Sequence, residues 1–142
     1  MDARRIGASI SCENSRIARL KILVVDDSQD AAESLQLLLT LNGADVGVAH
    51  SGPEALSVFE ATRPQVVLLD IGMPGMDGYE VARALRATWP TLAVALVAVT
   101  GWGEAEDRER TRQAGFDHHF VKPIDFDALK VLIASMEPGT ES

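Results

Sequence analysis

The sequence has little cysteine, no long apolar run and no recognisable export signal. Its 142 residues include one cysteine, Cys12, so no disulfide can form within the chain and a reducing compartment is the natural setting. No run approaches the roughly 18 consecutive apolar residues that a membrane-spanning helix needs. The arginines near the start are followed by no sustained apolar stretch, as a secretion signal would require. We therefore expect a cytoplasmic protein that does not enter the membrane.

Positive charge is also scarce. Lys and Arg number 13 against 21 Asp and Glu, which gives a formal net charge of −8. Residues 1–20 carry a net charge of +2, which leaves −10 for the rest of the chain. An acidic body of this kind repels the phosphates of DNA and RNA, so we expect no nucleic-acid partner. The same acidic excess suits a site that holds a cation.

The length and composition fit one globular domain with its own core. The chain is 46% hydrophobic and 24% charged, and it contains no repeat or low-complexity tract. Residues 1–20 show little periodicity and are predicted to form an N-terminal tail or linker. Residues 21–136 are predicted to form the domain, and residues 137–142 a C-terminal tail.

Short apolar runs rich in Val and Ile predict β-strands. These runs are Lys21–Val25, Ala44–Ala49, Gln65–Leu69, Leu92–Val99 and His118–Val121. The fourth run is almost wholly apolar, as expected of a central parallel strand that is covered on both faces.

The segments between these runs predict amphipathic helices. They are Ser28–Leu41, the segments that begin at Ser51 and Asp77, Glu104–Ala114, and the segment that Asp125 caps. The first helix is expected to carry Leu35, Leu38 and Leu39 on one face. Ser51 and Glu54 have the spacing of a capping box, and Asp77 fits the role of a helix cap.

Strands and helices therefore alternate along the chain as five βα units. Such a pattern predicts the α/β class, with a doubly wound five-stranded parallel sheet and helices on both faces. Right-handed crossovers leave few other topologies.

Polar side chains stand where the predicted strands end. They are Asp26 and Asp27 after the first strand, Asp70 after the third, Thr100 and Gly101 after the fourth, and Lys122 and Pro123 after the fifth. Any one of them alone is more often a helix cap, a turn residue or a surface lysine. In an open parallel sheet, however, ligands bind beyond the carboxyl ends of the strands. The convergence of all these positions on one edge predicts a site.

The residue types at this edge indicate phosphoryl chemistry. Three clustered carboxylates cannot all stay ionised cheaply unless a cation joins them, and oxygen ligands favour Mg²⁺, for which Mn²⁺ can substitute. An ammonium group beside them indicates that an anionic group is held as well. A phosphoryl group has both needs. Asp70 is the central carboxylate, so we expect it to be the nucleophile that forms an acyl phosphate.

Several segments resemble response-regulator receiver domains of two-component systems. These segments are KILVVDDS, VVLLDIGMPGMDGYE, AVTGWGE and GFDHHFVKP, in family-like order over roughly residues 20–135. The second and fourth are most similar to receivers of hybrid sensor histidine kinases. The resemblance implies a flavodoxin-like fold with strand order 2-1-3-4-5. It also implies a phosphoacceptor signalling module rather than a turnover enzyme, whose own chemistry is limited to self-catalysed phosphotransfer and slow autodephosphorylation.

The resemblance assigns the phosphoryl donor and the metal ligands. A histidine kinase or a histidine phosphotransfer protein would pass its phosphoryl group to Asp70. Asp27, Asp70 and the backbone carbonyl of Gly72 would bind Mg²⁺ directly, and Asp26 would act mostly through water.

The resemblance also assigns the phosphoryl-binding and switch residues. Thr100, Gly101 and Lys122 would hold the phosphoryl group, and Pro123 would follow a cis peptide bond. The family often has Tyr or Phe as a rotating switch at the position of His119, so Thr100 and His119 are the expected switch pair here. The neighbouring histidine faces the other side of the strand, so the two histidines cannot chelate one ion together.

Further residues are expected to modulate the site or to transmit the signal. Gly72 and Trp102 are candidates to shape access to the acyl phosphate. The Glu104–Ala114 helix, the fifth strand and the last helix are expected to form a response face for partners or for a dimer. On that helix Glu106 and Arg110 are spaced for an i,i+4 ion pair.

Three other functions are compatible with the same fold class. A flavin carrier needs a loop rich in Ser, Thr and Gly after the first strand, where Asp26 and Asp27 would repel the flavin phosphate. A phosphatase of the dehalogenase type places its nucleophile after the first strand, usually with a second Asp two residues on. Here the predicted nucleophile follows the third strand, and residue 72 is glycine. A degenerate receiver used only for docking conflicts with the intact acidic and lysine positions.

Overall fold

The computed structural model describes residues 20–101 and 105–135, with the backbone alone for residues 105–108. Its strands are β1 (Lys21–Val25), β2 (Asp45–Ala49), β3 (Val66–Asp70), β4 (Ala95–Thr100) and β5 (His118–Val121). Its helices are α2 (Gln29–Leu41), α3 (Gly52–Thr62), α4 (Gly78–Thr88), α5 (Ala105–Ala114) and α6 (Phe126–Ser135). The predicted alternation of strands and helices is confirmed.

The strands form one sheet in the order β2-β1-β3-β4-β5, and every neighbouring pair is parallel. The predicted α/β class and strand order are therefore confirmed. Because all the strands run the same way, their carboxyl ends meet at one edge of the sheet. The chain changes direction across the sheet between β1 and β3, which is where ligands bind in such folds.

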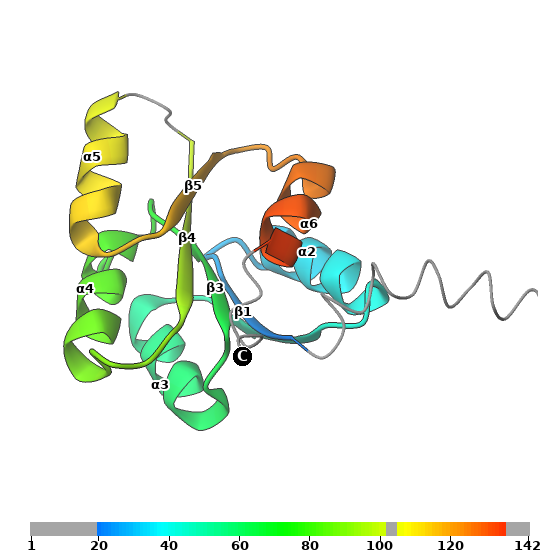
Figure 1. Ribbon diagram of the computed structural model, residues 1–142, viewed down its shortest axis with the longest axis horizontal. Helices are drawn as coiled ribbons and strands as arrows, with labels where there is room; N and C mark the ends of the chain where they lie inside the picture. Colours follow the sequence, from blue (N-terminus) through cyan, green and yellow to red (C-terminus); the bar gives the residue numbers. More distant parts are fainter. Residues whose placement is uncertain (1–19, 102–104, 136–142) are drawn as a thin grey trace, which may run out of the picture.

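Helices cover both faces of the sheet, as Figure 1 shows: α3, α4 and α5 lie on one side, and α2 and α6 lie on the other. Alternate residues of the central strands β1, β3 and β4 pack into the two cores on opposite faces of the sheet. In β1, Leu23 and Val25 pack on the α3–α5 side, whereas Ile22 and Val24 pack on the α2–α6 side. Since both faces are covered, the central strands are apolar at nearly every position.

The folded core reaches slightly beyond its predicted start. Leu20 is buried in the core on the α2–α6 side, and its carbonyl accepts a hydrogen bond from the Asp45 N–H at 2.8 Å. The rest of both predicted tails lies outside the described residues. Among the helices within the described ranges, none has the length and apolar composition needed to cross a bilayer.

The predicted start of the fourth strand was wrong. The sequence indicates Leu92–Val99, whereas β4 spans Ala95–Thr100. The N–H groups of Leu92 and Val94 donate to carbonyls within the preceding loop, at 3.2 and 3.1 Å. The first interstrand hydrogen bond comes from Ala95. Because the loop residues Leu92–Val94 are apolar, the predicted strand begins three positions before β4 does.

The predicted capping box at Ser51 is only half formed. The Ser51 hydroxyl accepts the Glu54 N–H at 3.2 Å, but the Glu54 carboxylate accepts from the His50 N–H instead of the Ser51 N–H. Asp77 makes a complete box with Glu80, because each side chain accepts from the other residue's N–H at 3.0 Å. The predicted cap at Asp77 is confirmed.

The three predicted leucines of α2 differ in burial. Leu39 is buried and Leu35 is partly buried, but Leu38 is 41% exposed. Leu38 nevertheless lines the same hollow as Leu35, Val24 and Leu68, so it lies at the margin of the helix face that turns toward the sheet. The predicted face is therefore present, but Leu38 is less buried than Leu35 and Leu39.

Candidate functional site

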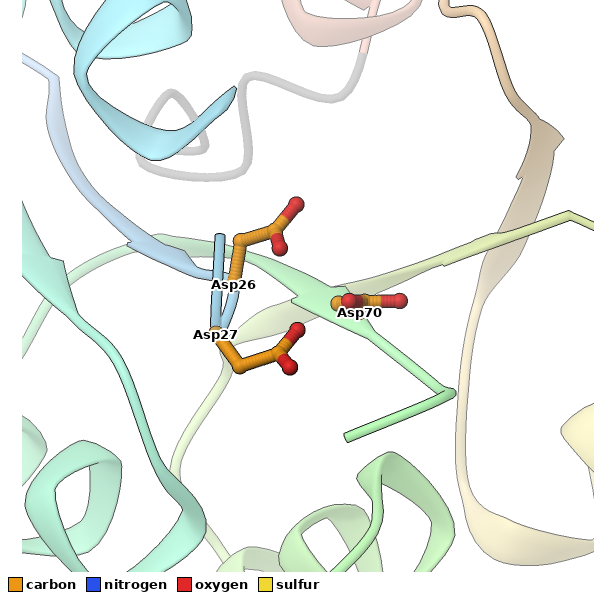
Figure 2. Close-up of side chains that lie close together, drawn as sticks. All are labelled: Asp26, Asp27 and Asp70. Carbon is orange, nitrogen blue, oxygen red and sulfur yellow. The ribbon is translucent and has the colours of Figure 1, made fainter. Parts of the chain in front are cut away.

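Three carboxylates meet at the carboxyl edge of the sheet. Asp26 and Asp27 follow β1, and Asp70 is the last residue of β3. One carboxylate oxygen from each lies within 4.8 Å of the others, and Figure 2 shows the side chains gathered at the ends of their strands. Asp26 and Asp70 are 7% and 6% exposed, whereas Asp27 is exposed. The sequence-predicted cluster is thus assembled by the parallel topology.

Hydrogen bonds hold the Asp26 end of the cluster in place. Its N–H donates to the Ala49 carbonyl at 3.0 Å, and its carboxylate accepts the Ser28 N–H at 2.9 Å as the chain turns into α2. Its own carbonyl lies 3.1 Å from Nδ1 of His50, at the end of β2. A carbonyl can only accept, so Nδ1 of His50 carries the proton. His50 was not among the site residues predicted from the sequence.

Lys122 supplies a positive charge to the cluster. Its Nζ lies 3.3 Å from Asp26 Oδ2 and 3.5 Å from Asp70 Oδ2. Its backbone N–H donates to the Thr100 carbonyl at 2.7 Å, which fixes the start of the β5–α6 connection against the end of β4. Burial by itself lowers the pKa of the ammonium group, but the carboxylates of Asp70 and Asp26 outweigh burial, and the pKa is raised.

Lys122 does not fully offset the effects of burial and of Asp26 on the Asp70 carboxyl. Burial raises the pKa of this carboxyl, and the nearby charge of Asp26 raises it further. The Lys122 charge and the hydrogen bond from the Gly72 N–H, at 3.2 Å, lower it without reversing the shift. One ammonium group therefore does not neutralise the three carboxylates, and the site favours an added cation.

The donor set fits a hard divalent cation. Carboxylate oxygens are the ligands that Mg²⁺ prefers, at about 2.1 Å each, so ligands across one ion stand about 4.2 Å apart. The oxygens of the three carboxylates need little movement to reach that spacing. When bound, the ion would relieve the repulsion among the carboxylates.

A hollow of about 500 Å³ opens beside the carboxylates. It is lined by Asp27, Asp70, Ile71, Gly72, Tyr79, Thr100, Gly101, Arg110 and Lys122. The predicted acceptor, hydroxyl and ammonium residues therefore share one open space that can admit a small anion. Thr100 is 5% exposed and ends β4 beside Asp70, which pairs with Val99 in the sheet register.

Three residues of this hollow, Ile71, Tyr79 and Arg110, were absent from the predicted site. Tyr79, in the first turn of α4, is buried, and the guanidinium carbon of Arg110 on α5 lies 4.3 Å from the centre of its ring. In the sequence, Arg110 is spaced for an i,i+4 ion pair with Glu106, whose side chain lies outside the part of the chain that the structure describes. No periodicity in the sequence links a residue in the first turn of one helix to the middle of the next.

Four further positions belong to the predicted site: Pro123, His119, Gly72 and Trp102. The peptide bond before Pro123 is cis. His119 is partly buried on β5, in register with Ala98. Gly72 borders open space, because a Cβ added to this residue would meet nothing within 4 Å. Trp102 lies outside the described residues.

The fold and this edge define a doubly wound α/β protein whose central strands end in an acidic, lysine-bearing site. The response regulator receiver domain family matches residues 22–134 of the chain. The chain therefore belongs to this family. The chain is similar to Response regulator MprA of Mycobacterium avium, with 39% identity over 117 residues. That match covers 82% of this chain and 49% of the relative, so the chain spans about half the length of MprA.

Solved structures agree with this membership. The chemotaxis protein CheY4 of Vibrio cholerae is 29% identical, with a TM-score of 0.75 over 81% of this chain and 97% of CheY4. A CheY-like receiver domain protein from Methanospirillum hungatei is 27% identical, with a TM-score of 0.79 over 87% of this chain and 98% of its own.

Proposed function

We propose that this domain accepts a phosphoryl group on Asp70, with Mg²⁺, and thereby switches a protein-interaction surface. The observation that carries the proposal is the position of Asp70. It is a buried carboxylate at the end of a central strand, within reach of two further carboxylates and 3.5 Å from an ammonium group. That arrangement matches the needs of phosphoryl transfer, in which a nucleophile, a cation site and a positive side chain surround the transferred group.

In the proposed reaction, a carboxylate oxygen of Asp70 attacks the phosphorus atom of the donor. A P–O bond to Asp70 forms as the donor's bond to phosphorus breaks, and the leaving group takes the electron pair of that bond. Bound Mg²⁺, held by Asp27, Asp70 and the backbone carbonyl of Gly72, would supply positive charge to the phosphoryl oxygens. Lys122 neutralises part of the added charge, and Thr100 and Gly101 donate hydrogen bonds to the phosphoryl oxygens.

The proposed donor is a phosphohistidine on a histidine kinase or a histidine phosphotransfer protein, in the cytoplasm. Family membership supports this donor class, and the likeness of two segments to hybrid-kinase receivers favours a place in a phosphorelay. The product is a signalling state rather than a released metabolite. We propose α5, β5 and α6 as the face that contacts a partner or a second copy of the chain.

We also propose that Thr100 and His119 act as the switch. Thr100 ends β4, and β4 pairs with β5, so a shift of the hydroxyl toward the phosphoryl group acts on the strand that carries His119. His119→Tyr should keep phosphorylation at Asp70 but change the phosphorylation-dependent shift of amide signals in β5. Identical shifts in both proteins would remove His119 from the switch.

Intact-mass spectrometry after incubation with acetyl phosphate and Mg²⁺ tests the main proposal. The wild-type protein should gain one phosphoryl group, and Asp70→Asn should gain none because an amide is no nucleophile under these conditions. Asp77→Asn is the matched control, since it alters a carboxylate that caps α4 outside the site and keeps a capping side chain. Full phosphorylation of Asp70→Asn would overturn the assignment.

A further inference from the structure

Arg110 brings a second positive charge to the hollow that contains Asp70. It projects from α5, and its guanidinium carbon lies 4.3 Å from the centre of the Tyr79 ring. Both residues line the same hollow as Asp70 and Lys122, and that hollow measures about 500 Å³. A long arginine side chain held at this rim faces the space that an incoming anion would enter.

The charge balance of the phosphorylated site favours a second positive side chain. Asp26, Asp27 and Asp70 together carry three negative charges and Lys122 carries one positive charge, so a divalent ion brings the metal-bound site to neutrality. Converting the Asp70 carboxylate into an acyl phosphate adds about one negative charge. The phosphorylated site is then one positive charge short of balance.

The contact that holds Arg110 in the resting protein is weaker than the one the phosphoryl group offers. A guanidinium group over a neutral ring at an accessible site gains little, because water screens the attraction. Hydrogen bonds from guanidinium to phosphoryl oxygens are charge-assisted and can form in pairs, since the planar fork of arginine matches the geometry of phosphate. Added negative charge at Asp70 therefore favours movement of Arg110 from Tyr79 to the phosphoryl group.

We propose that Arg110 is a second phosphoryl-binding residue, stacked on Tyr79 in the resting state and drawn to the phosphoryl oxygens once Asp70 is modified. The proposal rests on the proposed phosphoacceptor function and extends it to a named residue on α5. It gives α5 a direct connection to the modified residue, because Arg110 belongs to the helix itself rather than to a strand end.

The affinity for beryllofluoride, an acyl-phosphate mimic, tests this assignment in the full chain with saturating Mg²⁺. Arg110→Gln should weaken beryllofluoride binding by about five- to tenfold, the effect of losing one charge-assisted contact, while Mg²⁺ affinity stays unchanged. Arg110→Lys should recover part of the loss, since it restores the charge without the planar fork. Arg112→Gln is the control: it removes the same charge from the same helix, at a side chain that is 74% exposed and paired with Glu109.

The contact with Tyr79 gives a second measurement. Tyr79 is the single tyrosine of the chain, so its ring protons are readily assigned. The nuclear Overhauser effect between these protons and the Arg110 side chain should be present in the resting protein and lost with beryllofluoride. Equal beryllofluoride affinity in wild type and Arg110→Gln, or an Overhauser effect that persists, would overturn the inference alone. Failure of the wild-type protein to bind beryllofluoride would overturn the proposed function and this inference with it.

Discussion

The charge on Asp70 costs the metal-free protein folding stability. Its pKa is raised by burial and by Asp26, so the folded state favours the protonated carboxyl more than the unfolded chain does. The stability that protonation contributes is fully present below the ordinary pKa of the group and is lost as pH rises through the folded-state value. When ionised, Asp70 in the metal-free protein is therefore a buried charge that Lys122 and the Gly72 N–H do not fully compensate.

Asp70→Asn should accordingly stabilise the metal-free protein at pH 7, by on the order of 1 kcal/mol. The amide keeps the shape of the side chain and removes its charge. Urea unfolding in the presence of a chelator measures the effect, and the gain over wild type should shrink as the pH falls toward 4. A variant less stable than wild type at pH 7 would show that Lys122 already compensates the carboxylate.

Mg²⁺ should reverse this order. A ligand that binds only the folded state stabilises it by about 2.7 kcal/mol at a hundred times its dissociation constant. Wild type, with all three carboxylates, should gain more from Mg²⁺ than Asp70→Asn does, and removal of the ion should restore the original order. Equal gains in the two proteins would place the cation away from Asp70.

His50 is expected to position the acidic pair. Its Nδ1–H donates to the carbonyl of Asp26, which belongs to the peptide unit that leads into Asp27. His50→Ala should weaken Mg²⁺ binding by up to about tenfold, a size typical of partners that orient metal ligands. His50→Asn should restore most of the affinity, because its amide nitrogen can take the place of Nδ1. Isothermal titration with Mg²⁺ measures both, and equal losses in the two variants would indicate that His50 only fills space.

At the level of the elements, Arg86 joins α4 to two parts of the sheet layer. Its guanidinium donates to the carbonyls of Gly115 and Val94 at 2.8–3.0 Å and pairs with Asp117 at 2.9 Å. The Asp117 carboxylate also accepts the Leu96 N–H at 2.9 Å. The connection from α5 to β5 is thus tied to the last turn of α4 and to the start of β4.

Arg86→Ala should lower the free energy of unfolding by about 2 kcal/mol, the size expected when hydrogen bonds from a charged group to partly buried carbonyls are lost. Arg83→Ala, on an exposed position of the same helix, is the control and should change stability by less than about 0.5 kcal/mol. Gly115→Ala should also destabilise, because its φ is +107° and a Cβ there would lie 2.8 Å from Cγ of Arg86.

A double-mutant cycle separates the two causes in Gly115→Ala. If the clash with Arg86 contributes, the double variant should be less destabilised than the sum of the two single variants. Strictly additive effects in urea unfolding would assign the whole cost to the backbone conformation of residue 115.

The elements themselves could be predicted because each has the length and apolar pattern that its surroundings demand. Strands covered on both faces are short apolar runs, and helices between them repeat with a different period. The misplaced start of β4 has a local cause. Leu92 and Val94 are as apolar as strand residues, but their N–H groups bond within the loop. Hydrogen bonding, which apolar patterning does not report, determines where the strand begins.

At the scale of the whole molecule, parallel topology explains which part of the site could be predicted. Asp26, Asp70 and Lys122 stand at strand ends, and a parallel sheet places all such ends at one edge. His50, Tyr79 and Arg110 come from a loop and two helices. Their approach to the site depends on helix rotation and side-chain direction, which local sequence does not fix.

Phosphorylation should therefore affect some helices and strands more than others. The Thr100 carbonyl accepts the Lys122 N–H, so β4 and the β5–α6 connection meet at the acceptor, and Arg110 of α5 lines the same hollow. Toward the β2 end of the sheet, α3 is linked to the site through the loop that carries His50. The groups that respond directly to added negative charge are thus concentrated on α5, the end of β4 and the β5–α6 connection.

Hydrogen–deuterium exchange with Mg²⁺, with and without beryllofluoride, tests this asymmetry. We expect slower exchange by about threefold or more in α5, β5 and the β5–α6 connection, because new contacts to the mimic lower the frequency of local opening. Exchange in α2 and α3 should stay unchanged beyond their first turns. Asp70→Asn under the same conditions is the control for effects of the additives. Changes confined to α2 and α3 would place the response at the β2 end of the sheet, and the α5–β5–α6 face would then have no part in transmitting the signal.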